Sequence, residues 1–172
     1  MKSKDCDRLL KLAAGSLVLG EILREDVGRF ALELLESGAE GWRMASLATT
    51  KDTYGQSGDL KMFQRAIEEE GMSLPSRQKA IEYVVEHSCQ EISNGLTDPL
   101  DALLRISSLI VSYDPIPQPM QEFIGIYYEY HEELRHVIDK ADFLRGSKAD
   151  QMRKEVLAAA RDYLANYVSA RN

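Results

Sequence analysis

Apolar side chains recur at the spacing of an α-helix along almost the whole chain. In the segment 27–35 they stand at the first, fourth, fifth, eighth and ninth positions, which places them on one helical face. The same spacing recurs in 60–67, 80–92, 100–110, 120–141 and 152–168. No segment shows the sustained alternation of apolar and polar residues that a half-buried strand requires. The pattern therefore predicts an all-α fold.

Helix-breaking and capping residues mark where these helices begin and end. Glycines follow several apolar stripes as stop signals, namely Gly38, Gly71, Gly95 and Gly146. Asp98 followed by Pro99 is typical of an N-cap and a first helical residue. Ser147 with Asp150 resembles a second cap with an acid at the third position. The signals divide the chain into about seven to nine helices.

The length of 172 residues, with 44% apolar and 28% charged residues, predicts one globular domain over 1–172. Two breaks interrupt the helical pattern. A polar loop with two glycines is expected near 49–59, and three prolines predict a stiff extended connector over 114–119. The sequence leaves open whether 119–145 forms one helix or two.

The chain is acidic, with a net charge of −7, which excludes several kinds of partner. Basic residues occur singly among acids, so nucleic acid is not expected to bind. No apolar run reaches the ~18 residues of a membrane span, and the N-terminus lacks the pattern of a signal peptide. We expect a cytoplasmic protein with reduced cysteines, whose partner is a protein with a basic surface.

The run EYHEELRHVID (129–139) raises the possibility of a metal site. His131 and His136 stand five positions apart, about 140° around a helix, whereas zinc-binding helices place two histidines one turn apart. Glu133 with His136 matches half of a di-iron motif. The other half is missing, because Val84 stands three positions before His87 where an acid is needed. We therefore predict no metal, no cofactor and no catalytic residue.

The same run is the best candidate for a protein-binding surface. Tyr127, Tyr128 and Tyr130 span more than half of the helix circumference, so at least one of them must face solvent. Exposed tyrosines are common in protein interfaces. The candidate partner-binding residues are Glu129, Glu132, Glu133, Tyr128 and Tyr130, and secondarily Glu68, Glu69 and Glu70. Trp42 and Cys89 are both expected to be buried in the core.

Three stretches, FALELLESGAEGWRMASLATT, EISNGLTDPLDALLRISSLI and QEFIGIYYEYHEE, resemble small, acidic, all-helical bacterial proteins. Several of those proteins look like immunity proteins of polymorphic or contact-dependent toxin systems. The resemblance covers about residues 27–133 and includes the turn made by Asn94, Gly95, Asp98 and Pro99. It implies a non-enzymatic protein that binds and blocks one cognate toxin, and it supplies no active-site residues.

Two other functions stay open at this point. A helical adaptor or scaffold that holds a peptide in a groove is compatible with the pattern of helix pairs. A metal-dependent enzyme using Glu129, Glu133 and His136 is a third reading, which the incomplete ligand spacing disfavours. Partner identity and oligomeric state are not encoded in any motif of this sequence.

Overall fold

A computed structural model describes residues 3–49, 60–137 and 139–168. Its described part contains nine α-helices and no strand, which confirms the predicted all-α fold and the number of helices. The chain divides into two compact units, Met1–Val84 and Val85–Asn172, with the boundary inside helix α5 (Arg77–Ser93). Whether the two units act as the single predicted domain stays a prediction.

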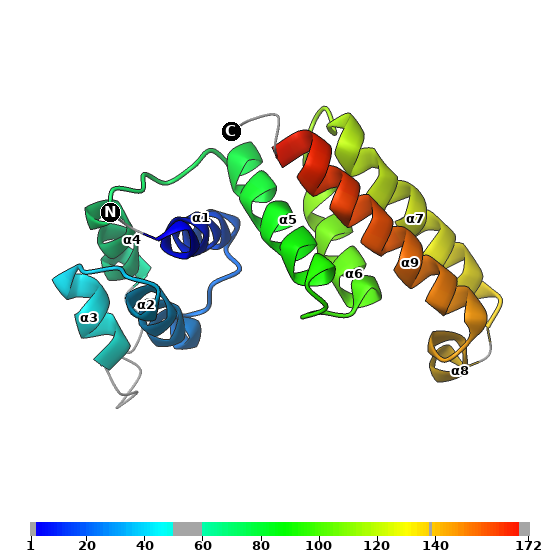
Figure 1. The fold of residues 1–172 in the computed structure, drawn as a ribbon, viewed down its shortest axis with the longest axis horizontal. Coiled ribbons are helices and arrows are strands. Elements are labelled where there is room, and N and C mark those ends of the chain that lie inside the picture. Colours follow the sequence, from blue (N-terminus) through cyan, green and yellow to red (C-terminus); the bar gives the residue numbers. More distant parts are fainter. Residues whose placement is uncertain (1–2, 50–59, 138, 169–172) are drawn as a thin grey trace. The chain divides into compact units, whose positions relative to one another are not determined.

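The first unit contains α1 (Lys4–Leu19), η1 (Arg24–Asp26), α2 (Val27–Glu36), α3 (Trp42–Thr49), α4 (Leu60–Glu69) and the start of α5 (Figure 1). One hydrophobic core receives side chains from all four α-helices that precede α5, including Leu10, Leu34, Met44, Phe63 and Ile67. Leu34, Phe63 and Ile67 occupy apolar stripes predicted from the sequence, whereas Leu10 and Met44 lie in helices for which no stripe was predicted. Burial of those stripes is the main force that holds a helical unit of this size together.

Gly15 allows α1 to approach α5 closely. A Cβ atom built at Gly15 would lie 3.0 Å from the Ala80 carbonyl oxygen and 3.3 Å from the Cβ of Tyr83. Both neighbours are fixed, one being backbone and the other the first carbon of a side chain. A larger residue at position 15 would therefore push the two helices apart.

The second unit contains the rest of α5, then α6 (Pro99–Ile110), α7 (Gln118–Arg135), α8 (Lys140–Leu144), α9 (Ser147–Asp162) and a short π-helix, η2 (Tyr163–Val168). Helices α6, α7 and α9 pack pairwise, and α7 and α9 run side by side in Figure 1. The buried side chains include Leu103, Ile110, Met120, Phe123, Met152 and Val156 of the predicted stripes. Ile106, Ile126 and Tyr130 are buried as well, although the prediction did not place them on those stripes.

Asp98 and Arg153 join three helices of the second unit. Asp98 caps α6 as predicted, because its carboxylate accepts a hydrogen bond of 2.9 Å from the Leu100 amide. Its other oxygen accepts from Arg153 Nε at 2.9 Å. Arg153 Nη1 also donates to the Leu144 carbonyl at the end of α8, at 3.1 Å. One guanidinium on α9 therefore fixes the beginning of α6 and the end of α8.

The region around 114–145 differs from the prediction in detail. The connector is shorter than 114–119, because α7 already begins at Gln118 with Pro119 in its first turn, where a missing N–H is tolerated. The segment 119–145 forms two helices, since α7 ends at Arg135 and α8 begins after the Asp139 cap. The predicted loop near 49–59 lies outside the described residues except for Thr49, the last residue of α3.

The predicted cap at Ser147 is wrong by one residue. Gly146 is the N-cap of α9 and Ser147 is its first helical residue. The reason is the tight reversal after α8, in which the Gly146 amide donates to the Phe143 carbonyl at 2.9 Å. No described helix is both long enough and apolar enough to cross a membrane.

Two glycine substitutions should have opposite effects on stability. Gly15→Ala should lower the free energy of unfolding by about 1–2 kcal/mol, because the added Cβ overpacks the α1–α5 contact. Gly125→Ala, inside α7 where a Cβ would meet no described atom within 4 Å, should raise it by about 0.5–1 kcal/mol through helix propensity alone. Urea unfolding followed by circular dichroism measures both; equal changes in both variants would contradict the described packing.

The Asp98 cap should make stability depend on pH. Burial alone would raise the pKa of Asp98, but the hydrogen bonds from Arg153 and the Leu100 amide outweigh burial and lower that pKa. The ionised carboxylate therefore stabilises the fold above about pH 3.9, the ordinary pKa of Asp, and this stabilisation is lost as the pH falls through the lower folded pKa.

Asp98→Ala should cost about 1 kcal/mol near neutral pH, and Asp98→Asn should cost less, because Asn still caps a helix. The stability difference between wild type and Asp98→Asn should shrink as the pH is lowered from 5 to about 2. Chemical denaturation across that range measures it, and a difference independent of pH would contradict the ion pair with Arg153.

Candidate functional site

The three acids predicted on α7 all have cationic partners within the second unit. Lys148, in the first turn of α9, donates to Glu129 at 2.6 Å and lies 3.4 Å from Glu133. These two contacts, Glu129 first, raise the pKa of the Lys148 ammonium above its ordinary value. Glu132 contacts Arg135 Nη1 at 3.0 Å and His136 Nε2 at 3.4 Å. The predicted acidic patch is therefore a network of alternating charge.

The three tyrosines of this segment have different surroundings. Tyr128 is 65% exposed, which confirms that one ring of the cluster faces solvent. Tyr130 is 2% exposed and packs against Phe143 of α8, with ring centroids 5.8 Å apart. Tyr130 therefore belongs to the core and was wrongly included among the partner-binding candidates. The helix rotates Tyr130 inward because it continues the stripe of Phe123 and Ile126.

Gly125 adds a feature that the sequence prediction missed. It lies one turn before Tyr128 and Glu129 on the exposed side of α7, together with Glu122 and Glu132. We call this set the outward face of α7. Gly125 leaves a flat spot on that face, because nothing in the described residues fills the space where a Cβ would lie. The signal that could have revealed it was a glycine inside a long helical stripe.

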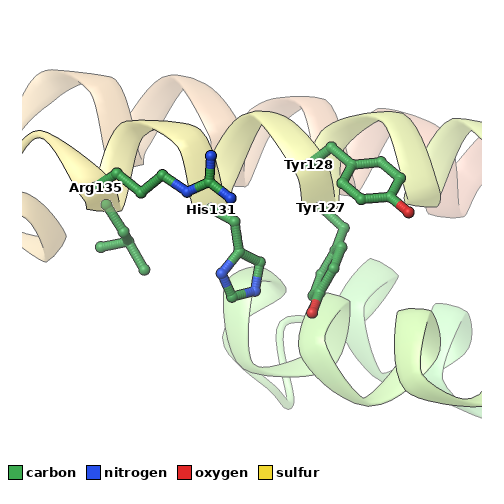
Figure 2. A pocket seen from close by; sticks show the side chains of 5 residues that line it. Tyr127, Tyr128, His131 and Arg135 are labelled. Atoms are coloured by element: carbon green, nitrogen blue, oxygen red, sulfur yellow. The ribbon is translucent and has the colours of Figure 1, made fainter.

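A second missed feature is an open hollow of about 350 Å³ along α7, lined by Tyr127, Tyr128, His131, Leu134 and Arg135. Figure 2 shows Tyr127 and His131 pointing toward the green ribbon beneath α7, while the Arg135 side chain runs back along the helix toward Tyr128. The Tyr127 and His131 rings contact each other edge to face, with centroids 4.4 Å apart. His131 Nε2 is buried without a hydrogen-bond partner among the described residues.

The remaining candidate metal ligands and nucleophiles are not arranged for catalysis or metal binding in the described residues. Within the described ranges, no three His, Cys, Asp or Glu side chains converge in a way that could hold a metal ion. Cys89 is buried as predicted, and burial, reinforced by the charge of Glu86, raises the pKa of its thiol. Such a thiol stays protonated and is a poor nucleophile. His87 lies 3.5 Å from Glu91, one turn further along α5.

The secondary candidates Glu68, Glu69 and Glu70 have structural roles in the first unit. Glu70 accepts hydrogen bonds from the Glu40 and Gly41 amides, at 2.9 Å and 2.6 Å, just before α3 begins. Glu69 forms an ion pair with Arg43. Two of the three acids therefore anchor the beginning of α3 to the end of α4, and Glu68 accepts from Gln64 within α4.

Trp42 is 64% exposed, so the expectation of a core position was wrong. It is the first residue of α3, and the Arg43 guanidinium stacks on its ring at 4.5 Å from the centroid. The inward positions of this short helix belong to Met44 and Leu47, which turns Trp42 outward.

Comparisons with known proteins give no match to a family model, a curated protein or a solved structure.

The exposure of Trp42 can be measured directly, because the chain has a single tryptophan. The native protein should emit at the long wavelength of a water-exposed indole, and acrylamide should quench it almost as strongly as in the urea-unfolded chain. A blue-shifted native spectrum with weak quenching would place Trp42 in the core after all. Trp42→Phe should change the free energy of unfolding by less than about 0.5 kcal/mol, as expected for a surface position.

Proposed function

We propose that this chain is a binding protein with no reaction of its own, and most concretely a cytoplasmic bacterial immunity protein that binds and covers a toxin. The observation that supports this best is the outward face of α7, where Tyr128 stands exposed beside Gly125. Exposed aromatic residues held on a rigid helix are the type that most often dominates the energy of protein interfaces.

Gly125 supports the proposal independently of Tyr128. A glycine inside a helix destabilises it by roughly 0.5–1 kcal/mol relative to alanine. Its backbone does not adopt a positive φ, and no described neighbour approaches it closely. Folding of the described residues gives no reason for a glycine there. Close approach of a partner's backbone to α7 does give one.

The charge of the second unit favours a basic partner. The segment 85–172 holds 14 Asp and Glu against 9 Lys and Arg, so it carries −5 of the chain's net −7. Such a surface attracts a cationic protein and speeds association, while the affinity itself comes from contacts at the centre of the interface. Because Lys148 and Arg135 neutralise part of the local charge, the acids of α7 are proposed as rim contacts around Tyr128.

Inhibition would follow from occlusion. A helix face laid across a toxin's cleft excludes the substrate sterically, and the acids at its rim pair with the basic residues that such a cleft presents to an anionic substrate. Glu69 and Glu70 are not part of the proposed face, because they already hold α3 in place.

Two measurements test the proposal: growth of cells that express the toxin, and the stoichiometry and affinity of the purified complex. The candidate toxin domain encoded beside this gene is expressed from an inducible promoter together with the wild-type chain or a variant. Wild type should restore growth and form a stoichiometric complex. Tyr128→Ala should weaken the complex at least tenfold, as expected of a central aromatic anchor. Gly125→Ala should also weaken it, by about tenfold, although it stabilises the free chain.

The matched control is Val111→Ala, because Val111 is 69% exposed in the same unit but lies just after α6. That variant should bind like wild type. Failure of the wild-type chain to form a complex or restore growth would overturn the immunity function. A complex whose affinity is unchanged by both α7 variants would overturn the assignment of the interface.

A further inference from the structure

The hollow along α7 has a composition unusual for so acidic a chain. Among the described residues, the five that line it include no acid, and Arg135 alone of these five carries a permanent charge. Its polar groups are two phenols, an imidazole and a guanidinium, all of which can donate hydrogen bonds. A site that offers donors and one positive charge is complementary to an anion.

The walls of the hollow are aromatic and held in position. Tyr127 contacts Tyr128 edge to face, with centroids 5.9 Å apart, and contacts His131 at 4.4 Å. His131 is backed in turn by the buried Tyr130, at 5.6 Å. Rings fixed by one another offer a contact surface with little entropy left to lose on binding. The volume of about 350 Å³ suits a group the size of a single ring system.

Arg135 retains the capacity to bind an anion. Its side chain is 74% exposed, and the one contact described for it joins Nη1 to Glu132. A guanidinium has five N–H donors and binds a carboxylate through two of them at once. Glu132 is also 3.4 Å from His136 Nε2, so a second polar partner is next to it when Arg135 turns to a ligand.

We propose that this hollow binds a monocarboxylate carried on a flat apolar body, with the carboxylate on Arg135 and the body against Tyr127, Tyr128 and His131. The group can come from a small organic acid or from the C-terminal aromatic residue of a peptide, since both present the same chemistry. The inference is independent of the proposed toxin partner, because it concerns the free chain.

The test is an NMR titration of the full-length, isotope-labelled chain with three probes of equal shape. Phenylacetate should produce saturable shifts in the amides of Tyr127, Tyr128, His131, Leu134 and Arg135. Phenylacetamide, which is neutral, should bind at least tenfold more weakly, and phenethylamine, which is cationic, should not bind there. A tetrapeptide ending in Phe, with a free or an amidated C-terminus, shows whether a peptide or a small acid fits better.

A variant and its control test whether the charge of Arg135 itself binds the carboxylate. Arg135→Gln should weaken phenylacetate about tenfold and leave phenylacetamide unchanged, whereas Arg161→Gln, an exposed cation of α9, should change neither. Glu132→Gln removes the competing carboxylate and should strengthen phenylacetate binding. Equal binding of the acid and the amide, shifts centred elsewhere, or no saturable binding would overturn the proposal. None of these results depends on finding a toxin partner. The carboxylate site and the toxin-binding function can therefore be overturned independently of each other.

Discussion

Burial of one stripe of α7 sets the rotation of that helix, and the rest of the candidate surface depends on it. Met120, Phe123, Ile126 and Tyr130 are all buried in the second unit, where α7 packs against α6 and α9 and Tyr130 contacts Phe143 of α8. Because a helix turns by about 100° per residue, this choice leaves the residues at the opposite positions outside. Gly125 and Tyr128 are exposed for that reason. The exposure of the residues in the proposed partner face is thus a consequence of how the core packs.

The positions of the helices also decide which cations pair with the acids of α7. The first turn of α9 places Lys148 between Glu129 and Glu133, and the last turn of α7 places Arg135 one turn after Glu132. Exposed pairs of this kind contribute little to stability, but they place a cation next to each of these acids. The acids of the outward face of α7 therefore have cations beside them, and one of these cations, Arg135, also lines the hollow.

The two proposals use neighbouring parts of one helix with different chemistry. The outward face combines an aromatic ring with a flat glycine and acids at its rim, which suits a large basic partner. The hollow combines aromatic walls with Arg135, which suits a small anionic group. Tyr128 borders both. A ligand in the hollow would consequently lie at the edge of the proposed protein interface.

Sequence periodicity alone determined the all-α class, several helix ends and part of the core, because each is set by local spacing and by short-range capping such as Asp98 before Pro99. The sequence predicted that at least one of the three tyrosines faces solvent, but it did not show that this one is Tyr128. Trp42 and Tyr130 were placed on the wrong side, since amphipathic spacing in a short helix or near a helix end leaves its rotation undetermined. Only the tertiary structure decided that Lys148 of α9 pairs with Glu129 and Glu133 of α7, because no local pattern encodes the mutual position of two helices. The hollow is lined by residues of α7 alone, and only the rotation of that helix in the fold decided which of its side chains line it.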